Sequence, residues 1–149
     1  MPVHLACSVA DMDRLTALAE RHGLLLVEDC AHAHGAAWRE RPVGSIGQLG
    51  SFSMQSSKLL TAGEGGAVTT SDDEIHQRLQ SLVNCGRKEP GYDAYREQML
   101  GYNLRMTEWQ AAVLGCQLER LDEQHSRRER SVAYLEAALS KLDLSLIHI

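Results

Sequence analysis

Lys58 is the residue of this sequence whose surroundings most clearly suggest chemistry. It lies between a serine-rich, strand-like segment, residues 51–57, and a Gly-Glu-Gly-Gly turn, residues 63–66. A neutral, partly apolar setting of this kind favours the uncharged amine, which can attack an aldehyde and form a Schiff base. The serines could donate hydrogen bonds to a phosphate, and the glycines would let the backbone approach it. A lysine after serines is, however, usually a solvated loop residue, so this signal needs a second one.

Asp29 supplies the second signal. It follows Leu24–Glu28, a run too short for a helix and too continuously apolar for a half-exposed strand, which predicts a parallel strand buried on both faces. A carboxylate at the carboxyl end of such a strand points to the crevice where α/β sheets bind ligands. Taken alone, Asp29 could equally cap a short stretch at residues 31–37. With Lys58 it matches pyridoxal phosphate, which needs a lysine for its aldehyde and an aspartate for its pyridinium nitrogen.

Alternating helical and strand-like patterns predict an α/β fold. Ser8 with Asp11, Ser71 with Glu74 and Thr107 with Gln110 each resemble a capping box, the pattern that opens a helix. The segment 86–102 has no periodicity and is expected to be a long loop. The expected elements are a helix Val9–His22, strands at 24–28, 50–54 and 66–70, a helix after Ser71, and a helix from Thr107 to about Lys141 with an apolar stripe of Trp109, Val113, Cys116, Leu118 and Leu121.

Composition excludes several classes of function. The chain has 149 residues, is 44% hydrophobic and carries a formal charge of −5, so it can form a core and does not suit a nucleic-acid partner. No apolar run reaches the roughly 20 residues that cross a bilayer, and the first residues do not resemble a signal peptide. We therefore expect a cytoplasmic protein. Its four cysteines, at 7, 30, 85 and 116, form no CxxC pair and are expected to be reduced thiols.

Histidines near Asp29 raise the question of a metal. Cys30, His32 and His34 alternate along the chain, which could suggest zinc, but no further ligand set follows them. We expect no metal and interpret His34 as a hydrogen-bonded structural residue. The segment His125–Arg130 is expected to form a solvated helix face, with partner binding as the less favoured interpretation.

Several motifs together resemble the DegT/DnrJ/EryC1/StrS aminotransferases, pyridoxal-phosphate enzymes of fold type I that aminate keto-sugars and keto-cyclitols. The resemblance spans nearly the whole chain. It is carried by Glu28-Asp29-Cys30-Ala31-His32-Ala33-His34-Gly35-Ala36, by Val43-Gly44-Ser45-Ile46-Gly47, by the Lys58 segment with Gly63-Glu64-Gly65-Gly66-Ala67-Val68, and by Gly101-Tyr102-Asn103-Leu104-Arg105-Met106 with Gln110-Ala111-Ala112.

The resemblance implies a role for each matching residue. Lys58 would hold the cofactor as an internal aldimine and then shuttle a proton, while Asp29 would pair with the pyridinium nitrogen and Ser53 would touch the phosphate. Asn103 resembles a residue that reaches the cofactor of a neighbouring subunit, which implies a homodimer. His32 stands where most members have a glutamine near the cofactor's 3-hydroxyl, and an imidazole can also donate a hydrogen bond there.

Within the family, the segments around Lys58 and Asp29 look most like glutamine-dependent scyllo-inosose aminotransferases. The resemblance implies amino transfer from glutamine or glutamate to a keto-cyclitol. Alternatives are a nucleotide-keto-sugar aminotransferase, although Leu59 replaces the asparagine usual there, and an enzyme like 3-amino-5-hydroxybenzoate synthase. A catalytically inactive sensor of the same fold is disfavoured because Lys58 and Asp29 occur together. A nucleotide-binding module is disfavoured because there is no GxGxxG or P-loop pattern.

The resemblance also implies a division of the chain. Residues 1–122 would be part of the large, cofactor-binding domain, a mostly parallel sheet flanked by helices and truncated at both ends. Residues 123–149 would be a linking helix towards a small C-terminal domain. We expect this polypeptide by itself to bind cofactor poorly and not to turn over.

Overall fold

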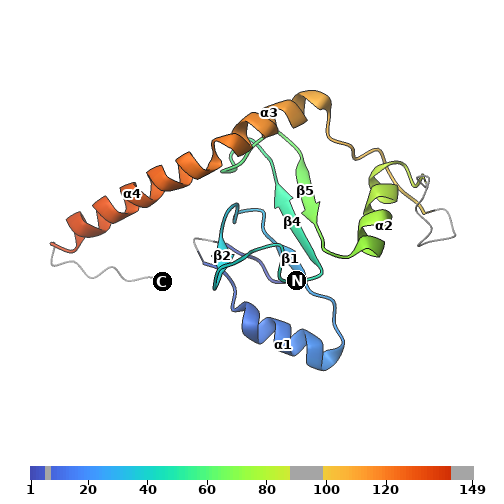
Figure 1. Cartoon of the computed structure of the whole chain (residues 1–149), viewed down its shortest axis with the longest axis horizontal. Coiled ribbons are helices and arrows are strands. Elements are labelled where there is room, and N and C mark those ends of the chain that lie inside the picture. Colours follow the sequence, from blue (N-terminus) through green and yellow to red (C-terminus); the bar gives the residue numbers. More distant parts are fainter. Residues whose placement is uncertain (6–7, 88–98, 142–149) are drawn as a thin grey trace.

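The computed structural model describes residues 1–5, 8–87 and 99–141, and at its centre lies a three-stranded sheet in the order β1-β4-β5 (Figure 1). β1 and β4 are parallel, with Asp29 opposite Ser51, and β4 and β5 are antiparallel, with Ser53 opposite Gly66. The predicted α/β class is confirmed. The elements in chain order are α1 (Met12–His22), β1 (Val27–Asp29), β2 (Ala37–Trp38), β3 (Arg41–Pro42), β4 (Leu49–Ser53), β5 (Gly66–Thr69), α2 (Asp73–Val83), α3 (Glu108–Glu119) and α4 (Leu121–Leu139).

α1 begins three residues later than the sequence indicated. Asp11, not Ser8, is the N-cap, and its carboxylate accepts a hydrogen bond from the Arg14 N–H at 3.1 Å. The predicted end is confirmed, because Gly23 adopts a left-handed conformation (φ +60°) that most other residues avoid. α2 differs in the same way, since Asp72 rather than Ser71 accepts the Ile75 N–H at 3.0 Å. In both helices the cap is an aspartate close to the serine that was predicted.

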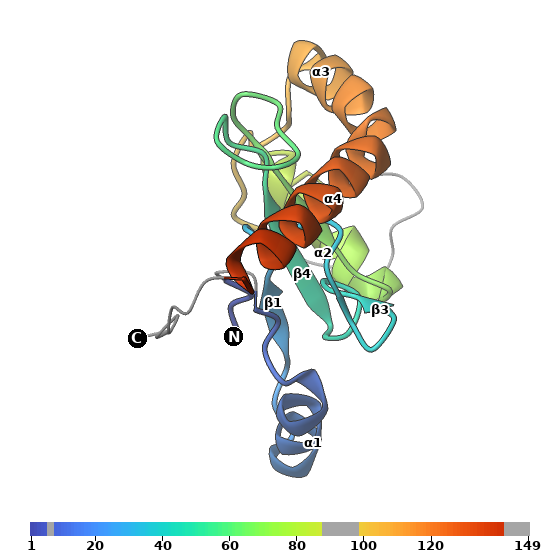
Figure 2. The same ribbon diagram turned by 90° about the vertical axis from the view of Figure 1, so that its left-hand side faces the viewer.

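The first strand is shorter and lies later than predicted. β1 starts at Val27, and the side chains of Leu24 and Leu25 are 58% and 76% exposed, so the prediction of a strand 24–28 buried on both faces was wrong for its first half. In Figure 2, α1 lies below the sheet, and the chain runs up from it into β1. Val3 forms a parallel bridge with Asp29, which adds backbone pairing on the other side of β1 from β4.

Two short elements were not predicted. Ala37–Trp38 and Arg41–Pro42 form a two-residue antiparallel hairpin whose turn residues, Arg39 and Glu40, both have positive φ. Since neither turn residue is glycine or asparagine, the usual sequence signal for such a hairpin is missing. The strands predicted at 50–54 and 66–70 are found within one residue of those bounds.

The C-terminal half forms a long helical arm. The predicted capping box at Thr107 and Gln110 is confirmed at the start of α3, but the helix predicted to reach Lys141 is divided at Arg120 into α3 and α4. Figure 1 shows α4 running away from the sheet. No residue of α4 is buried among those described. Much of the expected loop 86–102 lies outside the described residues, and Asn103 just after it pairs with Asn84.

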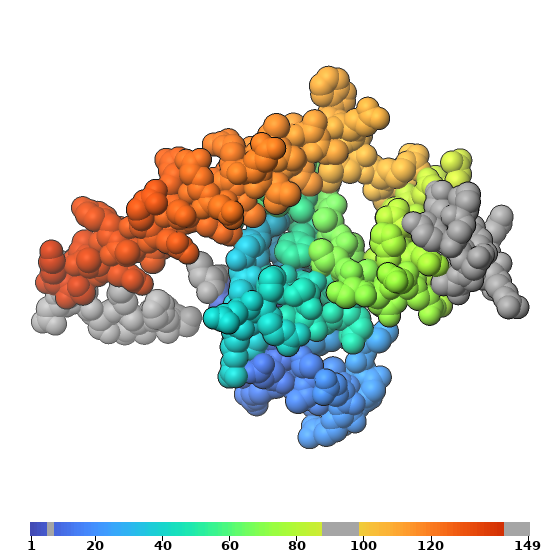
Figure 3. Space-filling view, viewed as in Figure 1, coloured from blue at the N-terminus to red at the C-terminus, as the bar shows by residue number. Residues whose placement is uncertain are grey.

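Three small apolar clusters replace one large core. The third, Met54, Leu60 and Ala62, is packed by Leu114 and Leu121 and supports the loop that carries Lys58. Most residues of the predicted apolar stripe of α3 do not pack on the core: Trp109 is 85% exposed and Leu118 58% exposed, so this prediction was wrong for them. The space-filling view shows the red end of α4 extending beyond the body of the molecule (Figure 3). None of the described helices is long and apolar enough to span a membrane.

Candidate active site

Lys58 lies in the loop that follows the carboxyl end of β4. Its side chain is half-buried, and its Nζ lies 2.9 Å from Nε2 of His32. A hydrogen bond from the Lys58 N–H to the Gln55 carbonyl, at 2.9 Å, makes a turn that directs the lysine. The structure thus brings together two predicted site residues that are far apart in sequence.

The loop around Lys58 is closed by hydrogen bonds at Met54. The Met54 N–H donates to the Gly65 carbonyl at 2.8 Å, and the Met54 carbonyl accepts from the Ala62 N–H at 2.9 Å and the Thr61 hydroxyl at 3.1 Å. Gly65 has φ +126°, a conformation that side-chain-bearing residues rarely adopt. These contacts fix both ends of the loop, so Lys58 is presented from an ordered frame.

Asp29 ends β1, one strand away from the strand that leads to Lys58. One carboxylate oxygen accepts a hydrogen bond from the Ala31 N–H at 3.1 Å, which caps the following turn but starts no helix. Within the described parts of the chain the other oxygen has no hydrogen-bond partner, and the side chain is half-buried. Asp29 therefore serves as a local cap and keeps one oxygen available.

Ser53 and His34 are joined at the carboxyl end of β4. His34 Nε2 donates to the Ser53 carbonyl at 2.9 Å, which confirms that His34 is a hydrogen-bonded structural residue. Burial lowers the pKa of His34 below its usual value, although the bond to Ser53 acts in the opposite direction. Nδ1 of His34 is buried without a partner among the described residues. The Ser53 hydroxyl accepts a long bond, 3.4 Å, from the Gln55 N–H.

The other predicted residues lie further from this group. Asn103 is exposed, and no hydrogen bond connects it to the other predicted site residues within the described chain. Ser56 and Ser57 are exposed and hydrogen-bond to the Gln55 side chain. The structure therefore assembles Lys58 and His32 directly, and sets the ends of β1 and β4 on neighbouring strands.

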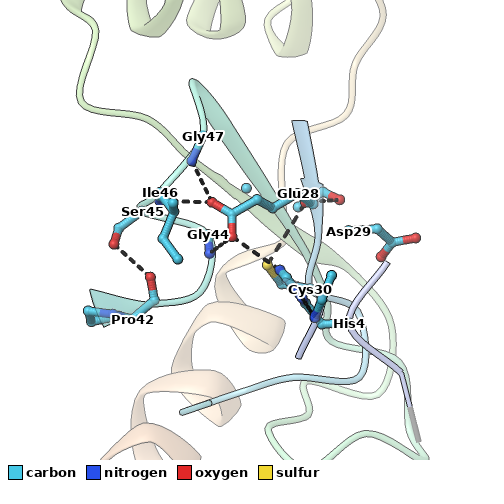
Figure 4. Close-up of polar contacts among 12 residues, drawn as sticks. His4, Glu28, Asp29, Cys30, Pro42, Gly44, Ser45, Ile46 and Gly47 are labelled. Carbon is cyan, nitrogen blue, oxygen red and sulfur yellow. Dashed lines mark hydrogen bonds and ion pairs between the residues drawn. The ribbon is translucent and has the colours of Figure 1, made fainter. Parts of the chain in front are cut away.

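Glu28 is a buried residue whose importance the sequence did not reveal. Its carboxylate is fully buried and accepts four hydrogen bonds: one oxygen from the N–H groups of Ile46 (2.8 Å) and Gly47 (2.7 Å), the other from the Gly44 N–H (2.9 Å) and His4 Nε2 (3.1 Å). Figure 4 shows this carboxylate directed at the 44–47 loop and Asp29 directed away from it. Because side chains alternate along a strand, fixing Glu28 on one face also fixes Asp29 on the other.

The charge of Glu28 is stabilised by these donors. Burial alone would raise the pKa of its carboxyl, but the N–H groups of the 44–47 loop and the His4 ring outweigh burial and lower it. The Ala10 N–H donates to Nδ1 of His4 at 3.2 Å, so the proton of the neutral ring is on Nε2 and is donated to Glu28. The available sequence signal for this network was a glutamate directly before Asp29, together with the Gly-Ser-Ile-Gly segment at residues 44–47.

No described metal-ligand cluster involves Cys30, His32 and His34 together. Cys30 instead lies near His4 and Glu28, but both of those side chains already use their ligand atoms in hydrogen bonds. Burial raises the pKa of the Cys30 thiol to about 12, and the charges of Glu28 and Asp29 add to the effect. Cys30, Cys85 and Cys116 are free thiols, and Cys7 lies outside the described residues.

The sequence of this chain is similar to those of known aminotransferases. An L-glutamine:scyllo-inosose aminotransferase of Streptomyces griseus is 49% identical over 151 residues, covering 96% of this chain and 36% of that protein. The chain spans about a third of the length of the curated relatives it matches.

Solved structures have the same fold. A 3-amino-5-hydroxybenzoic acid synthase is 41% identical with a TM-score of 0.81, covering 96% of this chain and 38% of that one. A candidate sugar aminotransferase from Streptococcus pneumoniae, in its PLP form, is 28% identical with a TM-score of 0.79, covering 93% and 40%. The sequence model of one family matches residues 1–149, and the chain belongs to the DegT/DnrJ/EryC1/StrS aminotransferase family.

Proposed function

We propose that the full-length protein is a pyridoxal-phosphate-dependent aminotransferase that moves an amino group from glutamine or glutamate to a keto-cyclitol such as scyllo-inosose. The observation that carries this proposal is Lys58, half-buried in a closed loop at the end of β4, with its Nζ 2.9 Å from His32. The similarity to an L-glutamine:scyllo-inosose aminotransferase supports the donor and the acceptor.

The residues present fit pyridoxal phosphate. Lys58 offers an amine for the aldehyde, Asp29 keeps a carboxylate oxygen for the ring nitrogen, and Ser53 offers a hydroxyl for the phosphate. When bound, the cofactor would supply an electron-accepting ring for the amino transfer. Lys58 would hold the cofactor and move a proton at its Nζ, and Asp29 would keep the ring nitrogen protonated.

His32 would orient the lysine. When Lys58 donates one N–H to Nε2 of His32, this hydrogen bond fixes the direction in which the lysine side chain points. The imidazole is exposed and can also meet the cofactor's 3-hydroxyl, as expected from its position in the family's motif. His32 would thus position both the nucleophile and the cofactor.

The remaining features belong to the assembled protein. We propose that residues 1–122 are part of the large domain and that 123–149 form a link to a small domain, which includes α4 from residue 123 onward. We further propose a cytoplasmic homodimer in which the exposed Asn103 reaches the site of the second subunit. Its partners would be small molecules rather than nucleic acid or a membrane.

A second acceptor class also has an observation in its favour. The 41% identity to a 3-amino-5-hydroxybenzoic acid synthase supports a reaction that gives this aromatic amine. The two candidates share the lysine, the aspartate and the cofactor, so they differ only in the acceptor.

Product analysis separates these candidates. The full-length protein is incubated with pyridoxal phosphate, L-glutamine and scyllo-inosose, and mass spectrometry measures the aminocyclitol formed. Lys58→Ala should reduce the rate by at least about a thousandfold, whereas Glu20→Gln, an exposed change on α1, should leave it nearly unchanged. A parallel incubation replaces scyllo-inosose with a cyclic keto acid, whose carboxyl group the aromatic product requires. Formation of 3-amino-5-hydroxybenzoate there, with no aminocyclitol from scyllo-inosose, would favour the second acceptor class. Cofactor binding without amino transfer to either acceptor class would indicate a binding protein and overturn the proposal.

A further inference from the structure

His125 contacts the loop that carries His32, although it belongs to a helix with few contacts to the body of the molecule. No described residue of α4 is buried, yet His125 is half-buried. Its ring lies directly on Gly35: a Cβ built at Gly35 would be 1.9 Å from His125 Cε1 and 2.8 Å from Nδ1. The expectation that His125 belongs to a solvated helix face is therefore wrong for this residue.

Gly35 suits this contact for two reasons. Its φ of +78° is a conformation that glycine adopts readily, and its lack of a side chain leaves room for the imidazole. Any larger residue at position 35 would collide with the ring. The match between a glycine and a histidine from a distant helix indicates a specific packing contact.

The contact lies on the same short loop as His32. The loop is folded back by hydrogen bonds from the Ala33 N–H to the Cys30 carbonyl (2.9 Å) and from the Ala36 N–H to the Ala33 carbonyl (3.0 Å). His32 leaves the loop toward Lys58, and His34 binds the Ser53 carbonyl. His125 covers the loop at Gly35, so it restrains the segment that presents His32.

One turn before His125, the same helix contacts the other loop of the site. Leu121 packs against the cluster of Met54, Leu60 and Ala62, which lies within the Lys58 loop. Residues four apart lie on one face of a helix, so Leu121 and His125 face the sheet together. The first turns of α4 therefore touch both the lysine loop and the histidine loop.

We propose that His125 is a positioning residue that holds His32 at Lys58 by packing on Gly35. The inference rests on the proposed function of Lys58. It makes the placement of α4 a determinant of how the lysine is presented, even though α4 supplies no group that would touch the cofactor.

A double-mutant cycle tests the contact in the full-length protein. The variants are Gly35→Ala, His125→Ala and the two combined, with His22→Ala on α1 as a matched histidine control. The measured quantities are the dissociation constant for pyridoxal phosphate and, in cofactor-free protein, the imidazole NMR signals of His32. His125→Ala should shift the His32 signals and weaken cofactor binding by about three- to tenfold. His22→Ala should do neither.

The combined variant gives the decisive result. Removing the ring relieves the collision made by Gly35→Ala, so the double variant should bind cofactor at least about threefold more tightly than Gly35→Ala alone. Effects that simply multiply, or His32 signals unchanged in His125→Ala, would overturn the proposal. If Gly35→Ala does not fold, the His32 signals in His125→Ala decide the matter. Because these signals need no cofactor, loss of this proposal is distinguishable from loss of the proposed function, which Lys58→Ala tests.

Discussion

Replacing Glu28 with glutamine tests the buried network beneath the candidate site. The substitution keeps shape and volume but exchanges one carboxylate oxygen for an NH₂ group. At one oxygen position this group would face the N–H groups of Ile46 and Gly47, and at the other it would face the Gly44 N–H and the His4 ring. In either orientation at least one buried donor loses its acceptor.

The magnitude follows from the number of donors affected. A buried group left without its hydrogen bond costs about 1–3 kcal/mol, so one or two such losses predict about 1–6 kcal/mol of lost stability for Glu28→Gln. His4 cannot compensate by exchanging its ring proton between nitrogens, because Nδ1 already accepts the Ala10 N–H. Asp29, the next residue of β1, should become less well held, and cofactor binding should weaken with it.

Urea unfolding measures the global loss, and amide hydrogen exchange of the 44–47 loop measures the local one. Glu20→Gln, an exposed change on α1, is the control and should stay within about 0.5 kcal/mol of the parent protein. A local loss of about 3 kcal/mol corresponds to roughly a hundredfold faster exchange. If Glu28→Gln behaved like Glu20→Gln in both measurements, the reasoning about this network would be refuted.

Three further predictions concern other parts of the fold. In the native protein, a thiol reagent at pH 8 should modify the exposed Cys85 and Cys116 while leaving Cys30 unmodified, since burial raises the pKa of its thiol to about 12; peptide mapping that finds equal modification would contradict this. Thr107→Ala should cost about 1 kcal/mol in urea unfolding by removing the cap of α3, and a change below about 0.3 kcal/mol would argue against the cap. Burial lowers the pKa of His34 below 6.5, so its neutral form contributes stability that is complete above about pH 6.5 and is lost as the pH falls through the lowered value. His34→Gln should therefore flatten this part of the plot of unfolding free energy against pH, and an unchanged slope would disprove the assignment.

Much of the fold could be predicted because local signals agreed with it. The helix ends at Gly23 and Thr107 and the strands of the Lys58 segment depend on residues close in sequence, and each was found near its expected place. The errors have local causes as well. In α1 and α2 an aspartate, not the serine that precedes it in the sequence, is the N-cap. The hairpin at Ala37–Pro42 turns at Arg39 and Glu40, which are not residues typical of such turns.

The candidate site was predicted only in part, because its geometry depends on long-range contacts. The local sequence indicated Lys58 and Asp29, and the family resemblance suggested His32 near the cofactor's 3-hydroxyl. Nothing in the sequence indicated that Nε2 of His32 would meet the lysine amine. The role of Glu28 was missed because its partners are distant in sequence: three lie in a loop 16 to 19 residues away, and the fourth is His4. The contact of His125 with Gly35 joins residues 90 positions apart, so no local pattern distinguishes His125 from the solvated residues that follow it on the helix.

Trapping the cofactor tests the central claim most directly. The full-length protein is mixed with pyridoxal phosphate, reduced with borohydride and digested, and the modified peptide is identified by mass spectrometry. We expect the cofactor on the peptide that contains Lys58 and no stable modification in Lys58→Ala. Cofactor attached to a different lysine, or trapped equally well in Lys58→Ala, would contradict the account.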